Sequence, residues 1–270
     1  MITVTALYIY PVKSCAGIRC AQAALDARGL RHDRGWMIVD GHNEFVTQRE
    51  HPRLALITPQ LEADTLRLTT PEGQAVSVST TSVVGPTRRV RVWRDWCEAV
   101  DQGDAVAQFF SDWLGESVRL VKMADSFERQ VDPRYAKAPA FTGFSDGYPL
   151  LLVSEASLDD LNARLDTPLP MNRFRPNLVV TGCDPHAEDG WQQVKLNTIT
   201  FDVAKPCERC TVTTTDQATG ERGVEPLRTL ATYRRVGTKV YFGQNIIHRT
   251  AGTLAVGEPV EVVLREQPRS

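Results

Sequence analysis

Two cysteines three positions apart, in the run KPCERC, are the part of this sequence with the clearest potential for chemistry. Thiolates bind soft metals and also exchange disulfides, so the spacing of Cys207 and Cys210 admits several kinds of site. The pair follows a predicted strand, and Pro206 is expected to end that strand because proline cannot donate to a sheet ladder. Lys205 and Arg209 are positive charges that would favour the thiolate form of these cysteines.

These two cysteines are compatible with several kinds of site. A zinc site needs further ligands, but the sequence has no second CxxC motif and its five histidines are solitary. A thioredoxin-type dithiol stands at the start of a helix, whereas the run Thr211–Thr215 favours a strand. Two buried structural thiols are the simplest alternative. The last alternative is one thiolate that binds a transition metal delivered within a cofactor.

Short strands separated by turn residues are expected to dominate the first ninety residues. Met1–Tyr10 is rich in β-branched residues and tyrosine, which favour strands. Trp36–Val39 and Glu44–Gln48 flank the run DGHN, which is typical of a hairpin. Further strands are expected at Leu54–Ile57, Leu66–Thr69 and Ala75–Ser79. Such a series predicts a barrel or a sandwich.

The rest of the chain mixes helices with strands. Apolar residues at helical spacing predict helices at Asp104–Leu114, after a cap at Ser154, and at Pro226–Tyr233. The polar segment 124–143 contains two prolines and is expected to be a loop between subdomains. Strands are expected at Val118–Met123, Asn177–Thr181, Val194–Val203, Thr211–Thr215, Lys239–Asn245 and Val260–Leu264.

The composition is ordinary for a soluble globular protein, with 42% hydrophobic and 24% charged residues in 270. A net charge of −2 argues against binding of nucleic acid as a polymer, although it allows a local basic pocket. No apolar run approaches the roughly 20 residues that span a bilayer, and the N-terminus reads as a strand rather than a signal peptide. We therefore expect no membrane association, a cytoplasmic location and reduced thiols.

Several motifs, in order along nearly the whole chain, resemble those of the MOSC-domain family. YPVKS at Tyr10–Ser14 and HDRGWMIVD at His32–Asp40 look like the β-barrel domain that precedes a MOSC domain. The MOSC-like motifs are SEASLDDLN at Ser154–Asn162, FRPNLVV at Phe174–Val180, KPCERCTVTTTDQATGE at Lys205–Glu221, FGQN at Phe242–Asn245 and AGTLAVGEPV at Ala251–Val260. The resemblance extends to bacterial reductases of N-hydroxylated compounds and to the mitochondrial amidoxime-reducing component.

The resemblance implies a molybdenum cofactor, in which the metal is held by a molybdopterin. It makes Cys210 the protein ligand to the metal and the catalytic residue, and it gives Cys207 no such role. It assigns the cofactor phosphate to Lys13, Ser14 and Arg34, since arginine suits a bidentate grip on phosphate and lysine supplies a point charge. It assigns pterin contacts to Asp146, Arg175 and Asn177.

The implied fold is mainly β with several helices. A MOSC N-terminal β-barrel-like domain would span residues 1–122 and a MOSC domain residues 123–268, with the cofactor between them. The implied function is molybdenum-cofactor-dependent reduction of small N-hydroxylated compounds from N–OH to N–H. The alternative is a cofactor carrier or sulfur-transfer module without reductase turnover.

The implied reduction needs two electrons from a donor. The sequence ends at Ser270 with no cysteine beyond Cys210, so the four cysteines of a ferredoxin-type cluster are not expected in this chain. No haem-binding or flavin-binding motif is evident either. We therefore expect a separate electron-donor protein, either a ferredoxin or a flavoprotein reductase.

Overall fold

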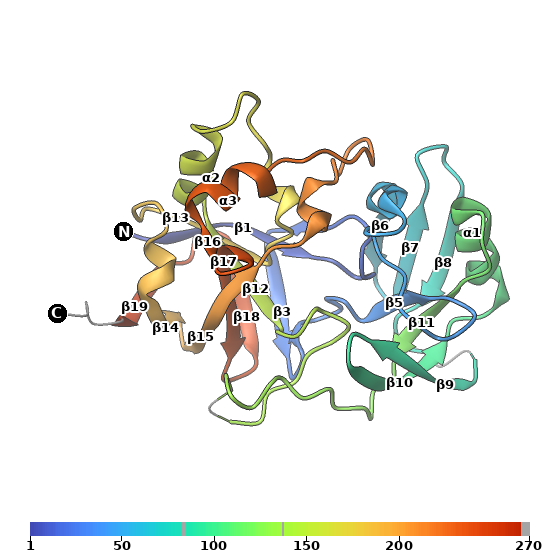
Figure 1. Cartoon of the computed structure of the whole chain (residues 1–270). Helices are drawn as coiled ribbons and strands as arrows, with labels where there is room; N and C mark the ends of the chain where they lie inside the picture. Colours follow the sequence, from blue (N-terminus) through green and yellow to red (C-terminus); the bar gives the residue numbers. More distant parts are fainter. Residues whose placement is uncertain (83–84, 137, 266–270) are drawn as a thin grey trace.

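A computed structural model, which describes residues 1–82, 85–136 and 138–265, is mainly β, as predicted (Figure 1). Its largest sheet has the strand order β19-β14-β15-β17-β12-β13-β1-β2, with β16 paired beside β17. The strands of this sheet are β1 (Thr3–Ile9), β2 (Ile18–Cys20), β12 (Leu150–Ser154), β13 (Leu178–Thr181), β14 (Trp191–Leu196), β15 (Ile199–Glu208), β16 (Arg235–Val236), β17 (Lys239–His248) and β19 (Val260–Arg265).

Three smaller sheets complete the described β structure, with the orders β5-β11-β10-β9, β6-β7-β8 and β18-β3-β4. The first sheet contains β5 (Trp36–Val39), β9 (Thr87–Val92), β10 (Asp95–Asp101) and β11 (Arg119–Met123). The second contains β6 (Thr58–Glu62), β7 (Thr65–Thr69) and β8 (Ala75–Ser79). The third contains β3 (Gln22–Asp26), β4 (Gly29–Leu30) and β18 (Gly252–Ala255).

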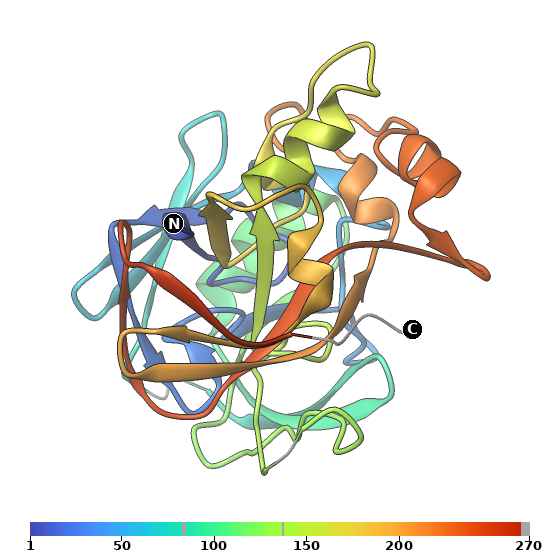
Figure 2. The same cartoon turned by 90° about the vertical axis from the view of Figure 1, so that its left-hand side faces the viewer.

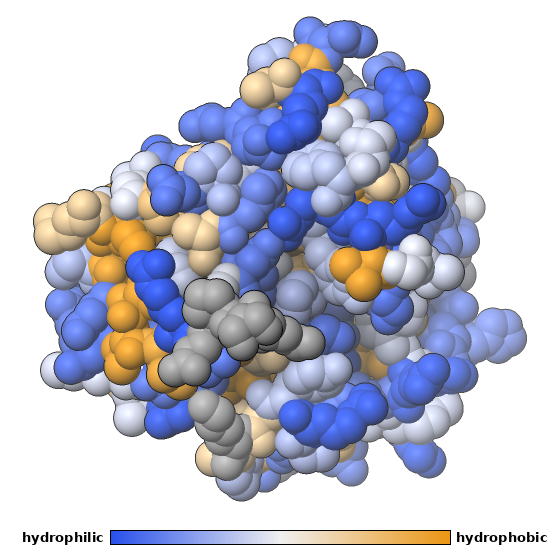
Figure 3. Space-filling view, turned by 60° about the vertical axis from the view of Figure 1, so that its left-hand side comes forward, coloured by the Kyte–Doolittle hydropathy of each residue, from blue (hydrophilic) through white to orange (hydrophobic). Residues whose placement is uncertain are grey.

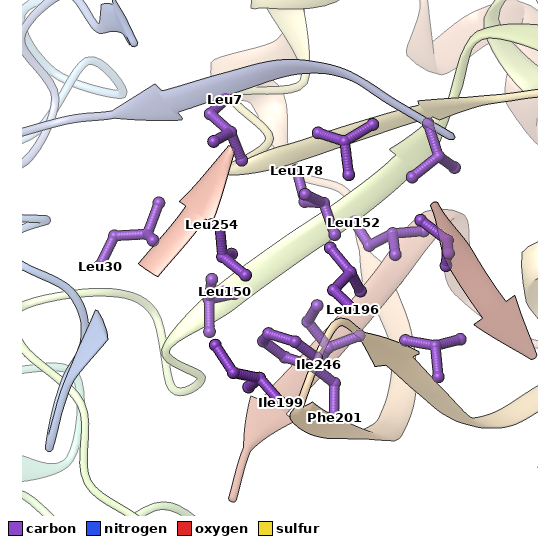
Figure 4. Packing of buried hydrophobic residues seen from close by; sticks show 14 of the residues in the cluster. Leu7, Leu30, Leu150, Leu152, Leu178, Leu196, Ile199, Phe201, Ile246 and Leu254 are labelled. Carbon is purple, nitrogen blue, oxygen red and sulfur yellow. The ribbon is translucent and has the colours of Figure 1, made fainter. Parts of the chain in front are cut away.

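The first strands of the chain belong to the same sheets as the last ones. β1 pairs with β13, and β3 pairs with β18, so both blue strands lie among the late strands in Figure 1. Leu7 and Leu30 accordingly pack in one core cluster with Leu152, Phe201 and Ile246 (Figure 4). The domain boundary predicted between residues 122 and 123 stays a prediction, while the early strands complete the core of the later half.

The helices lie outside these sheets, and α2 and α3 stand together above the strands in Figure 2. The α-helices are α1 (Asp104–Leu114), α2 (Glu155–Asn162) and α3 (Leu227–Tyr233), and the 3-10 helices are η1 (Pro52–Leu56), η2 (Met171–Arg173), η3 (Ala187–Gly190) and η4 (Thr211–Thr214). Within the described ranges, no helix is both long and apolar enough to cross a lipid bilayer. The face in Figure 3 is predominantly hydrophilic, with apolar side chains gathered toward one edge.

Local sequence rules account for two of the α-helices. α1 has the predicted bounds because Val106 and Phe110 are buried on one side of it and Gly115 ends it in the left-handed conformation. α2 begins after Ser154, whose hydroxyl accepts a hydrogen bond from the amide of Ser157 at 3.1 Å. Both helix predictions are confirmed.

Two predicted strands are wrong, because both segments are 3-10 helices. Leu54–Ile57 overlaps η1, which starts at Pro52. Thr211–Thr215 overlaps η4, in which the Thr213 hydroxyl donates to the Cys210 carbonyl at 2.9 Å. Such local bonds between a side chain and the backbone compete with strand pairing, even in a threonine-rich run.

Other strand predictions need correction at their limits. Val194–Val203 is two strands, β14 and β15, joined by a turn in which Asn197 is left-handed. β15 continues through Pro206, which the ladder accommodates next to a bulge. Glu44–Gln48 forms isolated bridges rather than a strand. The sequence analysis also missed strands β2, β3, β4, β6, β9, β10, β12, β16 and β18.

Candidate functional site

A cleft of about 470 Å³ lies where loops of the early and late parts of the chain meet. Every site residue expected from the sequence lines it, namely Lys13, Ser14, Arg34, Asp146, Arg175, Asn177 and Cys210. Their loops follow β1, precede β5 and β12, connect η2 to β13, and connect β15 to η4. The fold therefore gathers residues separated by up to nearly two hundred positions, while the role of each residue stays a prediction.

Lys13 is buried and already has an acidic partner. Its ammonium donates to Asp146 Oδ1 at 2.6 Å and to the Phe144 carbonyl at 2.9 Å. Burial lowers the pKa of Lys13, although the Asp146 carboxylate opposes that change. Desolvation by the surrounding protein raises the pKa of Asp146. The positive charges of Lys13 and Arg49 outweigh this effect and hold the pKa well below its usual range. Asp146 thus neutralises one charge of the cleft.

The Arg34 side chain links two loops of the cleft by hydrogen bonds. Its guanidinium donates to Asp33 Oδ2 at 2.6 Å, to Asn177 Oδ1 at 3.0 Å and to the Arg175 carbonyl at 3.1 Å. These bonds use three of the five N–H groups of the guanidinium, so Nε and the second N–H of Nη2 can still donate to a ligand. The contacts show that Arg34 joins the loop before β5 to the loop before β13.

Asn177 is more deeply buried, with 1% of its surface exposed. Its amide nitrogen donates to the Tyr8 carbonyl at 3.1 Å, and its side-chain oxygen accepts from the amide of Leu151 at 3.2 Å as well as from Arg34. It therefore ties β1, β12 and β13 together at one wall of the cleft. This geometry makes Asn177 a support for the wall more than a residue free to bind a ligand.

Arg175 is a buried cation whose charge is only weakly neutralised by neighbouring groups. Its guanidinium lies 4.3 Å from the Tyr10 ring centre, and Arg34 lies 4.2 Å from the same centre. Its side-chain hydrogen bond is a long one, 3.4 Å to Gln217 Oε1, and no ion pair is found for it in the described part of the chain. Burial lowers the pKa of Arg175 to about 10. An anion bound in the cleft would relieve this unfavourable burial.

Cys210 has a cationic neighbour that the sequence analysis missed. Arg49 Nη2 lies 3.2 Å from Cys210 Sγ, although the two residues are 161 positions apart. The same guanidinium lies 4.4 Å from the Trp93 ring centre and 3.9 Å from Asp146 Oδ2. No motif contains Arg49, so only the tertiary structure reveals this contact.

A set of long-range hydrogen bonds holds Arg49 in place. Arg222 donates to the carbonyls of Gln48 and Arg49 at 2.6 and 2.8 Å. The side-chain amides of Gln48 and Gln217 exchange two hydrogen bonds, of 3.1 and 3.0 Å. The segment before η1 is thus attached to the loop after η4, and this attachment sets Arg49 against Cys210.

Cys207 also lines the cleft but has different surroundings. Arg209 Nη1 donates to its sulfur at 3.0 Å, while Arg209 Nη2 donates to the Phe174 carbonyl at 2.7 Å. All six cysteines are free. Across the described ranges, no three His, Cys, Asp or Glu side chains form a cluster that could hold a metal by themselves.

The charges of the cleft suit an anionic ligand. Its lining has six cationic side chains, Lys13, Arg34, Arg49, Arg175, Lys205 and Arg209, and two acidic ones, Asp146 and Glu208. Lys13 neutralises Asp146, and Lys239 lies 2.7 Å from Glu208. A half-buried thiol beside this positive surface fits a phosphate-bearing cofactor whose metal accepts one thiolate from the protein.

Comparisons with known proteins agree with this organisation. The MOSC N-terminal beta barrel domain matches residues 1–117, and the MOSC domain matches residues 141–261. The chain is 36% identical to mitochondrial amidoxime-reducing component 1 of Homo sapiens and 37% identical to that of Mus musculus. These alignments cover 96% of the chain and 82% and 81% of the relatives. Molybdenum cofactor sulfurase of Danio rerio is 32% identical over 92% of the chain, which spans 32% of that protein.

Proposed function

Because the chain belongs to the family of proteins that join a MOSC N-terminal beta barrel domain to a MOSC domain, we propose that it is a molybdenum-cofactor-dependent reductase of N-hydroxylated compounds. The observation that carries the proposal is the Cys210 thiol in a positively charged cleft between loops of both matched regions. The amidoxime-reducing components cited above, which match nearly the whole chain, support the same reaction class. The proposal keeps residues 1–122 and 123–268 as the two domains.

The residues of the cleft divide into those that would hold the cofactor and those that shape its site. Cys210 would bind the metal, and Arg175 and Ser14 would contact the anionic part of the cofactor. Lys13 would add positive charge, which Asp146 partly neutralises. Asn177 would hold the loops together through its internal hydrogen bonds, and Arg34 would do the same while its remaining N–H groups contact the cofactor phosphate.

When bound, the cofactor supplies a molybdenum centre capable of two-electron, oxygen-removing chemistry. The overall reaction takes up two electrons and two protons, converts N–OH to N–H and releases water. The protein would orient the Cys210 thiol through Arg49, and it buries two of the cationic side chains of the cleft, Lys13 and Arg175. Its structural contribution is therefore binding, orientation and charge.

We also propose that a separate protein, a ferredoxin or a flavoprotein reductase, donates the electrons. These relatives are called amidoxime-reducing components, which supports a system of more than one protein. Docking of electron-transfer partners is usually small and transient. A partner would therefore approach the rim of the cleft without burying it permanently.

A second candidate function is a cofactor carrier or sulfur-transfer module. It is favoured by the 32% identity to a molybdenum cofactor sulfurase, although the chain matches only a third of that protein. The two functions share cofactor binding and differ in turnover. An assay of repeated turnover therefore separates them.

The test uses protein made in a host that synthesises the cofactor. We expect about one molybdenum per chain by metal analysis, and repeated reduction of benzamidoxime when reduced viologen supplies electrons. NADPH alone should support no turnover. Bound molybdenum without turnover would favour the carrier, and stoichiometric zinc without molybdenum would overturn both functions.

A further inference from the structure

A second groove continues from the proposed cofactor cleft. It has a volume of about 850 Å³ and lies between the turn that joins β9 to β10 and the segment 129–133. Trp93, Asp146, Gly147, Tyr148 and Lys205 line both spaces. Because these five residues line both spaces, the groove and the cleft that contains Cys210 adjoin each other at them.

The groove differs from the cleft in its charge. Its lining contains four cationic and four acidic side chains, whereas the cleft has six and two. Ion pairs neutralise several of them, such as Arg91 with Glu44 at 3.2 Å and Arg129 with Asp95 at 2.8 Å. The lining also includes Phe45 and Trp93. Balanced charge beside aromatic surface suits an uncharged, planar molecule better than an anion.

Trp93 stands at the junction in a conformation that bulky residues rarely adopt. Its φ of 57° is left-handed, and 40% of the residue is exposed. Three contacts hold the ring in place. Its indole nitrogen donates to Asp146 Oδ1 at 3.1 Å, and its ring centre lies 4.9 Å from that of Phe45 and 4.4 Å from the Arg49 guanidinium. Backbone strain retained by such contacts is typical of functional positions.

Arg49 connects this ring to the thiol. Its guanidinium contacts the ring of Trp93 and, through Nη2, the sulfur of Cys210. An aromatic molecule on the exposed part of Trp93 would therefore lie one side chain, that of Arg49, away from the Cys210 sulfur. This arrangement suits a substrate with a planar body and a reactive group at one end.

We propose that the groove binds the aromatic body of the N-hydroxylated substrate, with Trp93 as its stacking surface, so that the protein selects aromatic over small aliphatic N-hydroxylated compounds. The inference rests on the proposed reductase function. It adds a substrate class and a specificity residue to that function.

Gly147 offers a way to close the junction without touching Trp93. A Cβ atom at this position would meet no atom within 4 Å, and its φ lies outside the left-handed region. A leucine there would fit the backbone and extend into the space between cleft and groove. Gly190 also has no atom within 4 Å of a Cβ position but lies in η3, so Gly190→Leu is a matched control.

The kinetic test compares benzamidoxime with the aliphatic acetamidoxime on the molybdenum-loaded enzyme, with rates expressed per bound molybdenum. Loss of aromatic stacking should raise the KM for benzamidoxime about 5- to 10-fold in Trp93→Leu and leave that for acetamidoxime within about twofold. Trp93→Phe should restore most of the affinity. Equal changes for both substrates, or no change for either, would overturn the proposal.

A second test measures binding and does not depend on turnover. Without an electron donor, benzamidoxime should quench tryptophan fluorescence in the wild type and in Gly190→Leu, and its Kd should rise about tenfold in Gly147→Leu. If no N-hydroxylated compound is reduced while this pattern holds, the proposed function fails, whereas binding of an aromatic compound in the groove stands. If reduction proceeds while Gly147→Leu binds benzamidoxime as the wild type does, the groove assignment fails.

Discussion

At the scale of single residues, the two cysteines of one short motif have different neighbours. Cys210 faces Arg49 from the early part of the chain, whereas Cys207 contacts Arg209, two positions away. Arg209 is also bonded to the Phe174 carbonyl, which fixes it as part of the local framework. Of these two cysteines, only Cys210 therefore combines a place in the cleft lining with a cation from a distant part of the chain.

This difference predicts unequal effects of removing the two thiols. Cys210→Ser should abolish turnover and most molybdenum binding, because a hydroxyl is a poor substitute for a soft thiolate ligand. Cys207→Ser should retain most of both. Molybdenum content and benzamidoxime reduction measure the effects, and an inactive Cys207→Ser with an active Cys210→Ser would reverse the ligand assignment.

At the scale of elements, one buried carboxylate joins three strands and a helix. Asp101, at the end of β10, accepts hydrogen bonds from Arg88 on β9 at 2.6 Å and from two nitrogens of Arg119 on β11. It also accepts from the amide of Gly103, just before α1, at 2.8 Å. Burial raises the pKa of Asp101, but these hydrogen bonds outweigh it and lower the pKa to about 2.

The low pKa of Asp101 predicts a pH-dependent loss of stability. Its stabilisation is present above the unfolded pKa of about 4 and is lost as the pH falls toward 2. Asp101→Asn should therefore lower the free energy of unfolding by about 2 kcal/mol at pH 7 and by about half as much at pH 3. Urea unfolding at both pH values measures this, with the exposed Asp64→Asn as control. A difference that stays constant with pH would contradict the prediction.

At the scale of the whole molecule, the site depends on how the early and late parts of the chain are joined. The segment that carries Gln48 and Arg49 is attached to the loop after η4 through Arg222 and Gln217. Both segments also border the cleft or support its lining. The position of Arg49 against Cys210 is thus a consequence of this attachment.

Removing the attachment should affect cofactor retention more than the fold. Arg222→Ala loses hydrogen bonds to two carbonyls, so we expect unfolding to become easier by about 1 kcal/mol. Molybdenum content should fall several-fold because Arg49 is no longer held. Arg228→Ala, which removes an exposed pair with Glu225, is the control. Full molybdenum content in Arg222→Ala would show that the attachment does not maintain the site.

The sequence by itself determined features that depend on nearby residues or on recognisable motifs. The bounds of α1, the cap of α2 and the mainly β class follow from local patterning. The motifs also named seven residues that line one cleft, with roles that await the tests above.

Only the tertiary structure decided what depends on contacts between distant segments. It placed β1 in the sheet of the late strands, Arg49 against Cys210, and Trp93 between the cleft and the groove. It also formed η4 where the threonine run favoured a strand, because hydroxyl bonds to the local backbone prevailed there. The spacing of residues along the sequence does not reveal how close distant segments come in space, because strand order and loop packing determine which residues meet.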